Sequence, residues 1–376
     1  MKLQTRDSSI ELLKVLAMVA IVFSHVAQSL LPSGGGASTD ISYCIDYSLA
    51  SSDPALWVLV CLRTLGAWGN TIFVIASAWY LCLSDCARLS KVVKLVLNVF
   101  AISMTVLILA LVLGVRLGAK DVVKCFLPTT FANNWFVTCY ILLYAIHPAL
   151  NWVFERLSKR GHAGACVVLF AIYMLLPVVH KGHFFINELL IMVTEYALVA
   201  YGRYYLPDTL ESAKVGWLSF LVGTLGILLA IVALEQAGIR IGALSGKMLH
   251  FDVDGNPLLF LSALGLFNLV RSRPFVSVRI NRVASLMLLV YLTHENLIVR
   301  QYVRPAAWLW IYENLSYDLL FVWLGLFSVG LFVSSLFCAY VYTKTIGRAT
   351  SLVTPRVEAS VRRAGSAAID RVCALG

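Results

Sequence analysis

The stretch that decides the fold lies near the N-terminus and reads Ser9-Ile-Glu-Leu-Leu-Lys-Val-Leu-Ala-Met-Val-Ala-Ile-Val-Phe-Ser-His25. It belongs to an apolar run of membrane-spanning length, about 20 residues, yet it carries Glu11, Lys14 and His25. At about 100° per residue, Lys14 and His25 differ by about 20° and share a face, with Glu11 within about 60° of them. Charges inside a bilayer are costly, so the polar stripe predicts a spanning helix that faces the interior of a helix bundle.

The composition of the whole 376-residue chain is that of a multi-pass membrane protein. Hydrophobic residues make up 60% and charged residues 13%, and the mean hydropathy is +0.83. A soluble domain carries about a quarter charged residues, so a soluble Rossmann or TIM-barrel enzyme is excluded. The net charge of +10 indicates cytoplasmic loops rather than a nucleic-acid partner. The nine cysteines form no C-x-x-C pair, and no metal site is expected.

Ten apolar segments are predicted to span the membrane. In chain order they are 9–31, 56–83, 95–115, 132–154, 163–179, 184–205, 215–234, 258–270, 282–300 and 319–343. With the N-terminus inside, the cytoplasmic segments hold 20 Lys and Arg residues and the outer segments hold 8, as the positive-inside rule requires. The acidic loop 32–55, which has no Lys or Arg, is placed outside.

The predicted fold is therefore an all-α integral membrane protein of about ten transmembrane helices in one bundle, with both termini cytoplasmic. Residues 1–346 form the membrane domain. Residues 347–376 are polar, basic and rich in Ala and Ser, and they are expected to form a weakly ordered cytoplasmic tail that can lie on anionic lipid.

Several ionisable residues allow both a structural and a functional interpretation. Glu11 and Lys14 could form a neutralising pair near the inner interface, with His25 hydrogen-bonded near the outer one. The basic residues Arg88, Lys91 and Lys94 could anchor the third span or bind the phosphates of a ligand.

Two later spans carry acidic or mixed polar groups. Glu195 lies deep in the sixth span, and His294-Glu295-Asn296 form a cluster of polar residues in the ninth. A structural hydrogen-bond network could account for this cluster, but buried polar groups are a costly way to hold helices together. We therefore expect these residues to belong to a functional site.

Five motifs follow one another along the chain. They are Lys14-x10-His25, Ile75-Ala-Ser-Ala-Trp-Tyr-Leu81, Lys91-Val-Val-Lys94, Asn134-Trp-Phe-Val-Thr-Cys-Tyr140 continuing through Asn151, and Val290-Tyr-Leu-Thr-His-Glu-Asn296. Together they resemble the acyltransferase-3 family, integral-membrane enzymes that acylate cell-surface polysaccharides. The likeness runs from residue 9 to about 346. Lysines stand at 91 and 94 where many members have arginines, so bidentate phosphate binding is lost there.

The resemblance implies an O-acyltransferase that moves an acetyl group, or succinyl in a minority of members, from acyl-CoA to a sugar hydroxyl. The acceptor would be a surface or exported polysaccharide or its lipid-linked precursor. The enzyme would lie in the bacterial inner (cytoplasmic) membrane, with no tightly bound cofactor. Membrane lipid would surround it, and polysaccharide assembly proteins could associate with it.

Candidate site residues follow from the same motifs and from the buried polar groups. His25 is the expected general base, because imidazole has the one unperturbed side-chain pKa near neutrality. The other candidates are Lys14, His294 and Glu295 for catalysis, Arg88, Lys91 and Lys94 for the donor phosphates, and Trp135, Tyr140, Glu195 and Asn296 for substrate binding. Two other functions remain open: a proton-coupled transporter or flippase for a polysaccharide precursor, and a non-catalytic partner in polysaccharide export.

Overall fold

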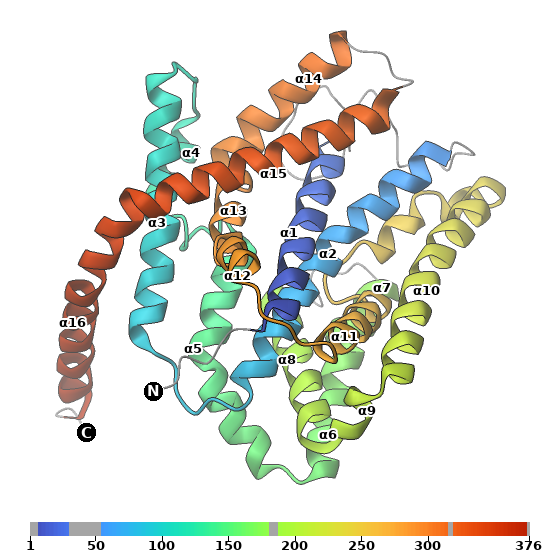
Figure 1. The fold of residues 1–376 in the computed structure, drawn as a ribbon, viewed down its shortest axis with the longest axis horizontal. Coiled ribbons are helices and arrows are strands. Elements are labelled where there is room, and N and C mark those ends of the chain that lie inside the picture. The colour runs from blue at the N-terminus through green and yellow to red at the C-terminus, as the bar shows by residue number, and fades with distance from the viewer. Residues whose placement is uncertain (1–6, 30–53, 180–186, 315–318, 374–376) are drawn as a thin grey trace.

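A computed structural model describes residues 7–29, 54–179, 187–314 and 319–373, and every regular element in these ranges is helical (Figure 1). The helices are α1 (Ser8–Gln28), α2 (Pro54–Leu81), α3 (Leu89–Val112), α4 (Ala119–Phe126), α5 (Trp135–Arg156), α6 (Lys159–Phe170), α7 (Leu176–Val179), α8 (Glu188–Tyr205), α9 (Pro207–Glu211), α10 (Ala213–Arg240), α11 (Pro257–Arg271), α12 (Val278–Ala284), α13 (Met287–His294), α14 (Arg304–Asn314), α15 (Leu320–Lys344) and α16 (Ile346–Cys373). Almost all of the predicted loop 32–55 lies outside the described residues.

The described helices confirm an all-α membrane protein. Seven stretches are long and apolar enough to cross a bilayer: α1, α2, α3, α5, α10, α15 and the continuous stretch Lys159–Val179 that contains α6 and α7. An eighth candidate is a bent pair, Val278–His294 and Val299–Trp308, whose halves meet at 60°. The predicted count of ten would also need α8, which carries Glu188, Glu195 and Arg203, and the shorter α11, so that count stays a prediction.

The ninth predicted span was wrong as a single continuous helix. Residues 282–300 include the end of α13 at His294, after which the chain turns by 60°. The side-chain Oδ1 of Asn296 accepts the backbone N–H of Ile298 at 3.0 Å, as an N-cap residue does at the start of a helix. The helix therefore breaks at the polar segment His294-Glu295-Asn296.

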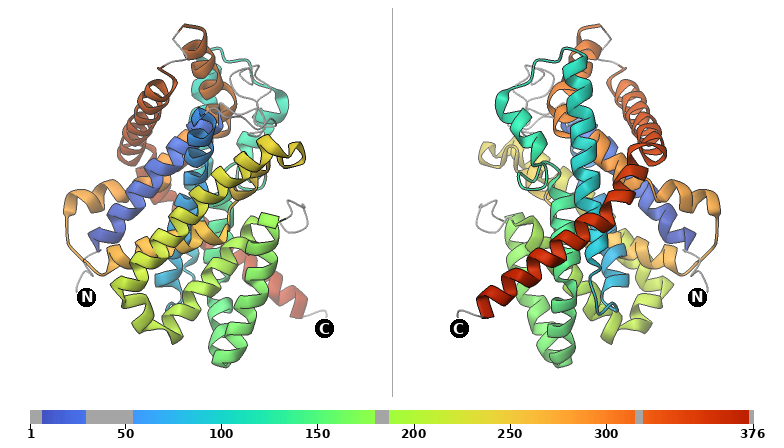
Figure 2. Two further views of the ribbon diagram at one scale, coloured as in Figure 1. Left: turned by 90° about the vertical axis from the view of Figure 1, so that its right-hand side faces the viewer. Right: turned by 90° about the vertical axis from the view of Figure 1, so that its left-hand side faces the viewer.

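Helix α1 runs through the middle of the bundle, beside α2 and against α11, α12, α13 and α15 (Figures 1 and 2). Its first turn is held by a distant part of the chain. Ser8 Oγ donates to Asn281 Oδ1 at 2.8 Å, and the Ser8 backbone N–H donates to Phe275 O at 2.9 Å. Asp7 caps the helix through the N–H of Ser9. These bonds fix where along the bundle axis the residues of α1 lie.

Two helix pairs approach so closely that a side chain could not fit between them. At Gly69 of α2, an added Cβ would lie 2.7 Å from the carbonyl oxygen of Ala17 in α1. At Gly223 of α10, it would strike the backbone of Ser262 and Leu258 in the α11 region. Small residues at helix crossings are the usual means of packing helices in lipid, where no hydrophobic force draws them together.

The basic segment that was expected to be weakly ordered is helical. Helix α16 packs along α3 and projects obliquely past it (Figure 2). Thr350 is buried against α3, where its hydroxyl and that of Tyr342 lie 3.4 and 2.9 Å from Asn98 Oδ1. Glu358 and Arg362 form an i,i+4 ion pair at 2.8 Å, a spacing that supports helices. The composition gave no sign of the contact with α3.

Substituting Gly223 with Ala should destabilise the bundle by about 1–3 kcal/mol, the usual cost of overpacking, because the methyl group meets backbone rather than a flexible side chain. Thermal unfolding of the detergent-solubilised protein measures this. Gly330→Ala in α15 is the matched control, since a Cβ there has nothing within 4 Å. Equal unfolding temperatures for the two variants would contradict the close α10–α11 contact.

Candidate active site

His25 lies in the last turn of α1 and faces α13. The preceding residue, Ser24, donates its hydroxyl to the carbonyl oxygen of Arg63 in α2 at 2.6 Å. Successive residues of a helix point about 100° apart. Because Ser24 faces α2, the imidazole of the next residue, His25, points away from α2 and toward α13. Its Nδ1 lies 2.9 Å from Oε2 of Glu295 and 3.1 Å from Nε2 of His294.

Glu295 is held in place at the break between α13 and the following helical segment. Its backbone carbonyl accepts from Asn134 Nδ2 at 3.0 Å, and its Oε1 accepts from Arg304 Nη2 at 3.0 Å. His294, Glu295 and Arg304 are each no more than 4% exposed. The carboxylate thus bridges two cationic or protonatable partners, His25 and Arg304, inside the bundle.

Hydrogen-bond chemistry fixes the tautomers of the two imidazoles. His294 Nδ1 lies 2.8 Å from the carbonyl oxygen of Val290, which can only accept, so this nitrogen carries the proton and Nε2 has a lone pair. His25 Nδ1 faces that lone pair and the Glu295 carboxylate, so it carries the proton of a neutral His25. The remaining nitrogen, His25 Nε2, is then free to accept a proton. This is the arrangement in which a carboxylate orients a catalytic histidine.

His25, His294, Glu295 and Arg304, which we call the His25 cluster, also contain a buried pair of opposite charges. Glu295 and Arg304 have side chains that are each 5% exposed, and a buried charge is tolerated only when it is paired. When His25 takes up a proton, the imidazolium forms against the Glu295 carboxylate at 2.9 Å. The cluster can therefore stabilise the charge that general-base catalysis creates.

His25, His294 and Glu295 also have the donor atoms of a metal site, all within 4.8 Å of one another. The Glu295 carboxylate, however, already binds the Arg304 cation at 3.0 Å, which would repel a metal ion placed beside it. The expectation that no metal takes part stays a prediction.

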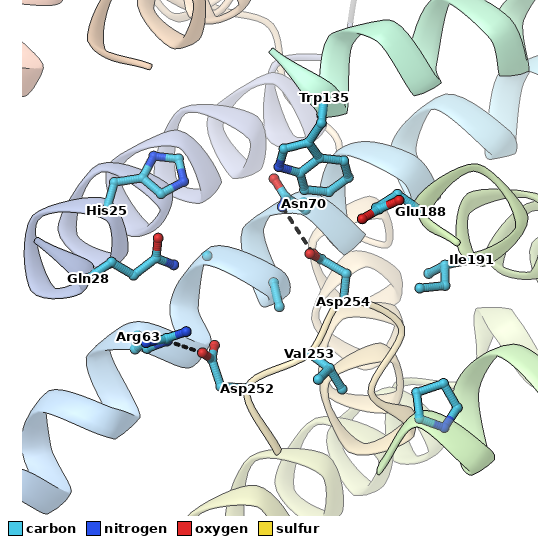
Figure 3. Close-up of a pocket in the computed structure, with 13 residues that line it drawn as sticks. His25, Gln28, Arg63, Asn70, Trp135, Glu188, Ile191, Asp252, Val253 and Asp254 are labelled. Carbon is cyan, nitrogen blue, oxygen red and sulfur yellow. Dashed lines mark hydrogen bonds and ion pairs between the residues drawn. The ribbon is translucent and has the colours of Figure 1, made fainter. Parts of the chain in front are cut away.

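A cavity of about 260 Å³ adjoins His25. Figure 3 shows the imidazole on one side and the indole of Trp135 with Asn70 on the other. Asp252 and Asp254 enter from the segment before α11, where Asp252 forms an ion pair with Arg63 of α2. The cavity is thus built from α1, α2, α5, α7, α8 and this segment, and it offers room for a reacting group beside His25.

The Asp254 carboxyl is the most perturbed acid in the connecting segments around the cavity. Burial raises its pKa to about 6, and the nearby carboxylates of Asp252 and Glu188 act in the same direction. The hydrogen bond from Asn70 Nδ2, 3.1 Å long, lowers its pKa in part. Asp254 can therefore change its protonation near neutral pH.

Other predicted site residues lie apart from the His25 cluster. Glu195 accepts the Thr71 hydroxyl at 2.7 Å and lies in a narrow extension of the cavity. Lys14 donates to Glu11 at 2.7 Å, which is the neutralising pair of the structural interpretation. Asn296 uses its side chain to cap the next helical segment. Trp135, by contrast, lines the cavity with His25.

The predicted donor residues gather at the other end of α3 and α5. The Lys91 ammonium lies 4.1 Å from the ring centre of Tyr144 and 6.0 Å from that of Tyr140. Lys91, Lys94 and Arg88 are all exposed. They form a basic surface patch, separate from the cluster around His25.

Sequence reasoning missed Arg304, Asn70 and Asp254. Arg304 was counted among the outer-loop cations because the helix break was not foreseen. The available signal was Asn296, a preferred N-cap residue directly after two ionisable ones. Asn70 and Asp254 gave no local signal, since only the fold brings α2 to the segment before α11.

The comparisons with known proteins bear on this geometry. The model of the acyltransferase-3 family, described as an acyltransferase domain, matches residues 7–343. The chain belongs to this family. No curated protein and no solved structure matched. The family match covers every residue of the His25 cluster, and with the apolar helices it shows a multi-pass membrane acyltransferase.

Replacing His25 with Ala should reduce acyl transfer by about 10²–10⁴-fold, the usual worth of a general base. Initial rates on purified protein, normalised to the folded fraction, measure the loss. His250→Ala serves as a histidine control, because its ring contacts the carbonyl oxygen of Val178 and lies outside the cluster. Near-normal turnover of a well-folded His25→Ala protein would rule out the assignment.

Glu295→Gln should lower kcat by about 10²–10⁴-fold while leaving KM for the acyl donor nearly unchanged, because it removes the carboxylate that orients and stabilises His25. Arg304→Lys keeps the charge but loses the planar fork, and a smaller loss of kcat is expected. A rise in KM with kcat intact would instead place Glu295 in donor binding.

Proposed function

We propose that this membrane acyltransferase moves an acetyl group, with succinyl as the alternative, from cytosolic acyl-CoA to a sugar hydroxyl. The acceptor is a surface or exported polysaccharide or its lipid-linked precursor, and the membrane is the bacterial cytoplasmic membrane. The observation that carries the proposal is the His25–Glu295 pair beside a cavity. It supplies a base whose free nitrogen can meet a hydroxyl group.

The thioester donor and the acceptor hydroxyl are the two reactants that this reaction needs. His25 Nε2 takes the proton of the acceptor hydroxyl as its oxygen attacks the thioester carbonyl carbon. The imidazolium is balanced by Glu295, which Arg304 holds in position. The carbon–sulfur bond then breaks, and the coenzyme A thiolate leaves with the proton from His25. A sugar ester and free coenzyme A result.

A line of aromatic residues links the basic patch to the cluster. Spacing by four places three side chains on one face of α5, over about 12 Å: Phe136, Tyr140 and Tyr144. The ring centre of Phe136 lies 5.9 Å from that of Tyr291, which lies 6.4 Å from that of His25. An acyl donor whose phosphates bind near Lys91 would extend its thioester along this face.

A proton-coupled transporter or flippase is the second candidate, because the α12–α14 region contains a broken span with buried charges, a feature of transporters. Membranes containing the protein, incubated with labelled acyl-CoA and cell-surface glycan, separate the two functions. The enzyme transfers label to the glycan, and the transporter does not. Mass spectrometry of glycan from a strain lacking the gene would then identify the missing acyl group.

Lys91→Ala combined with Lys94→Ala should raise KM for acyl-CoA about tenfold or more, because two cations near phosphate groups are lost. Arg at both positions should restore or improve binding through bidentate contacts. Arg362→Ala, on the exposed face of α16, controls for the loss of positive charge. An unchanged KM in the double variant would make these lysines topology anchors only.

Sidedness can be tested independently of activity. The charge count places the α10–α11 connection outside and the α5–α6 connection inside. In a Cys-free background, Cys at Gly242, an exposed position with open space for a side chain, should react with an impermeant thiol reagent on intact cells. Cys at exposed Ser158 should react only after the membrane is opened. The reverse pattern would put Lys91 on the side without acyl-CoA.

A further inference from the structure

The lining of the cavity beside His25 combines hydrogen-bond donors on Gln28 and Arg63 with acceptors on Asn70, Asp254 and Glu188. Asn70 is 9% exposed and directs its Nδ2 to Asp254 Oδ1 at 3.1 Å. Its Oδ1 is buried and has no hydrogen-bond partner in the described part of the chain. A buried acceptor without a donor is costly, so this oxygen calls for a donor from a ligand.

Among the described residues that line the cavity, acidic side chains outnumber basic ones. Asp252 is neutralised by its ion pair with Arg63, which leaves the carboxylates of Asp254 and Glu188 as the excess charge. Figure 3 shows these two carboxylates and the Trp135 indole directed toward the same part of the cavity, across from His25. A ligand in this space meets acceptors and negative charge on one side and the catalytic base on the other.

Trp135 adds an aromatic face to a lining that also contains the apolar side chains of Ala67, Pro177, Ile191 and Val253. An indole face packs well against a flat group that has carbon on its faces and polar atoms on its edges. A pyranose ring has this form, and its hydroxyl groups supply the donors that Asn70 and Asp254 require. A ligand with acidic groups would instead place negative charge against the carboxylates of Glu188 and Asp254, which form no ion pair with a cation in the described part of the chain.

We propose that the space between Asn70, Asp254, Glu188 and Trp135 is the acceptor subsite, and that it takes an uncharged sugar or an amino sugar and excludes uronic acids and phosphorylated sugars. This inference rests on the proposed function and narrows its substrate class. The subsite selects by repulsion as well as attraction, since the carboxylates penalise an anionic competitor.

Protection of His25 from carbethoxylation by diethyl pyrocarbonate tests the proposal without a known acceptor. Purified protein is treated in the presence of methyl glucoside, methyl glucosaminide or methyl glucuronide, at equal ionic strength, and modification of the His25 peptide is followed by mass spectrometry. At about 100 mM, which nearly fills a site of millimolar affinity, the first two should slow modification about threefold or more. The glucuronide should have no effect.

Charge-removing variants make the selectivity measurable. Glu188→Gln and, separately, Asp254→Asn keep the shape of each side chain and remove one negative charge. Each should improve protection by the glucuronide relative to the glucoside about tenfold, equivalent to about 1.4 kcal/mol. Glu358→Gln, in α16, is the matched control and should leave the ratio unchanged. Both substitutions keep the shape of the side chain, and the three glycosides are first compared on wild-type protein. The test therefore still stands if one variant fails to fold.

Each outcome bears on a different claim. Equal or stronger protection by the glucuronide, or an unchanged ratio in both folded variants, would overturn the exclusion of acidic sugars. Absence of protection by every glycoside would overturn the subsite itself. If the proposed function is wrong but the subsite exists, neutral sugars will still protect His25, and no label will pass from acyl-CoA to any glycan.

Discussion

The carboxylate of Glu295, shared between His25 at 2.9 Å and Arg304 at 3.0 Å, is the interaction on which the site depends. A charge in this buried position must be paired, and the pairing dictates local structure. The span ends at His294, so the guanidinium nine residues beyond Glu295 can return to it. Asn296 supplies the cap that the new helical segment needs. The helix break, the Asn296 cap and the orientation of His25 therefore all follow from the pairing of one buried charge.

The bundle around this pair positions it by close contacts between backbones. Because Gly69 has no side chain, α2 can closely approach the backbone of Ala17 in α1. On the same helix pair, the Ser24 hydroxyl of α1 donates to the carbonyl oxygen of Arg63 in α2. These contacts turn His25 toward α13 instead of toward lipid. Hydrophobic burial could not achieve this in a bilayer, where apolar surfaces gain little by leaving lipid. Steric fit and hydrogen bonds specify the site instead.

Much of this was visible in the sequence, and the reasons for the remainder are physical. The register of Lys14 and His25 on one helix face is local, so spacing alone revealed it, and the family motifs identified His294 and Glu295. Arg304 escaped because a 60° bend cannot be deduced from hydropathy, which reports apolar length and not direction. Asn70 and Asp254 meet only through the packing of α2 on the segment before α11. The helix at Ile346–Cys373 owes its place to contacts with α3, which its polar composition does not encode.

The bonds that tie Ser8 to Asn281 and Phe275 have a consequence for biogenesis. Helix α1 is anchored by residues that lie about 270 positions later in the chain, and its histidine meets its carboxylate at a similar separation. Domains acquire structure in the order in which they are translated, but His25 has no carboxylate partner until α13 and Glu295 have been inserted. A nascent chain that ends before Glu295 thus carries a His25 imidazole without the carboxylate that orients it.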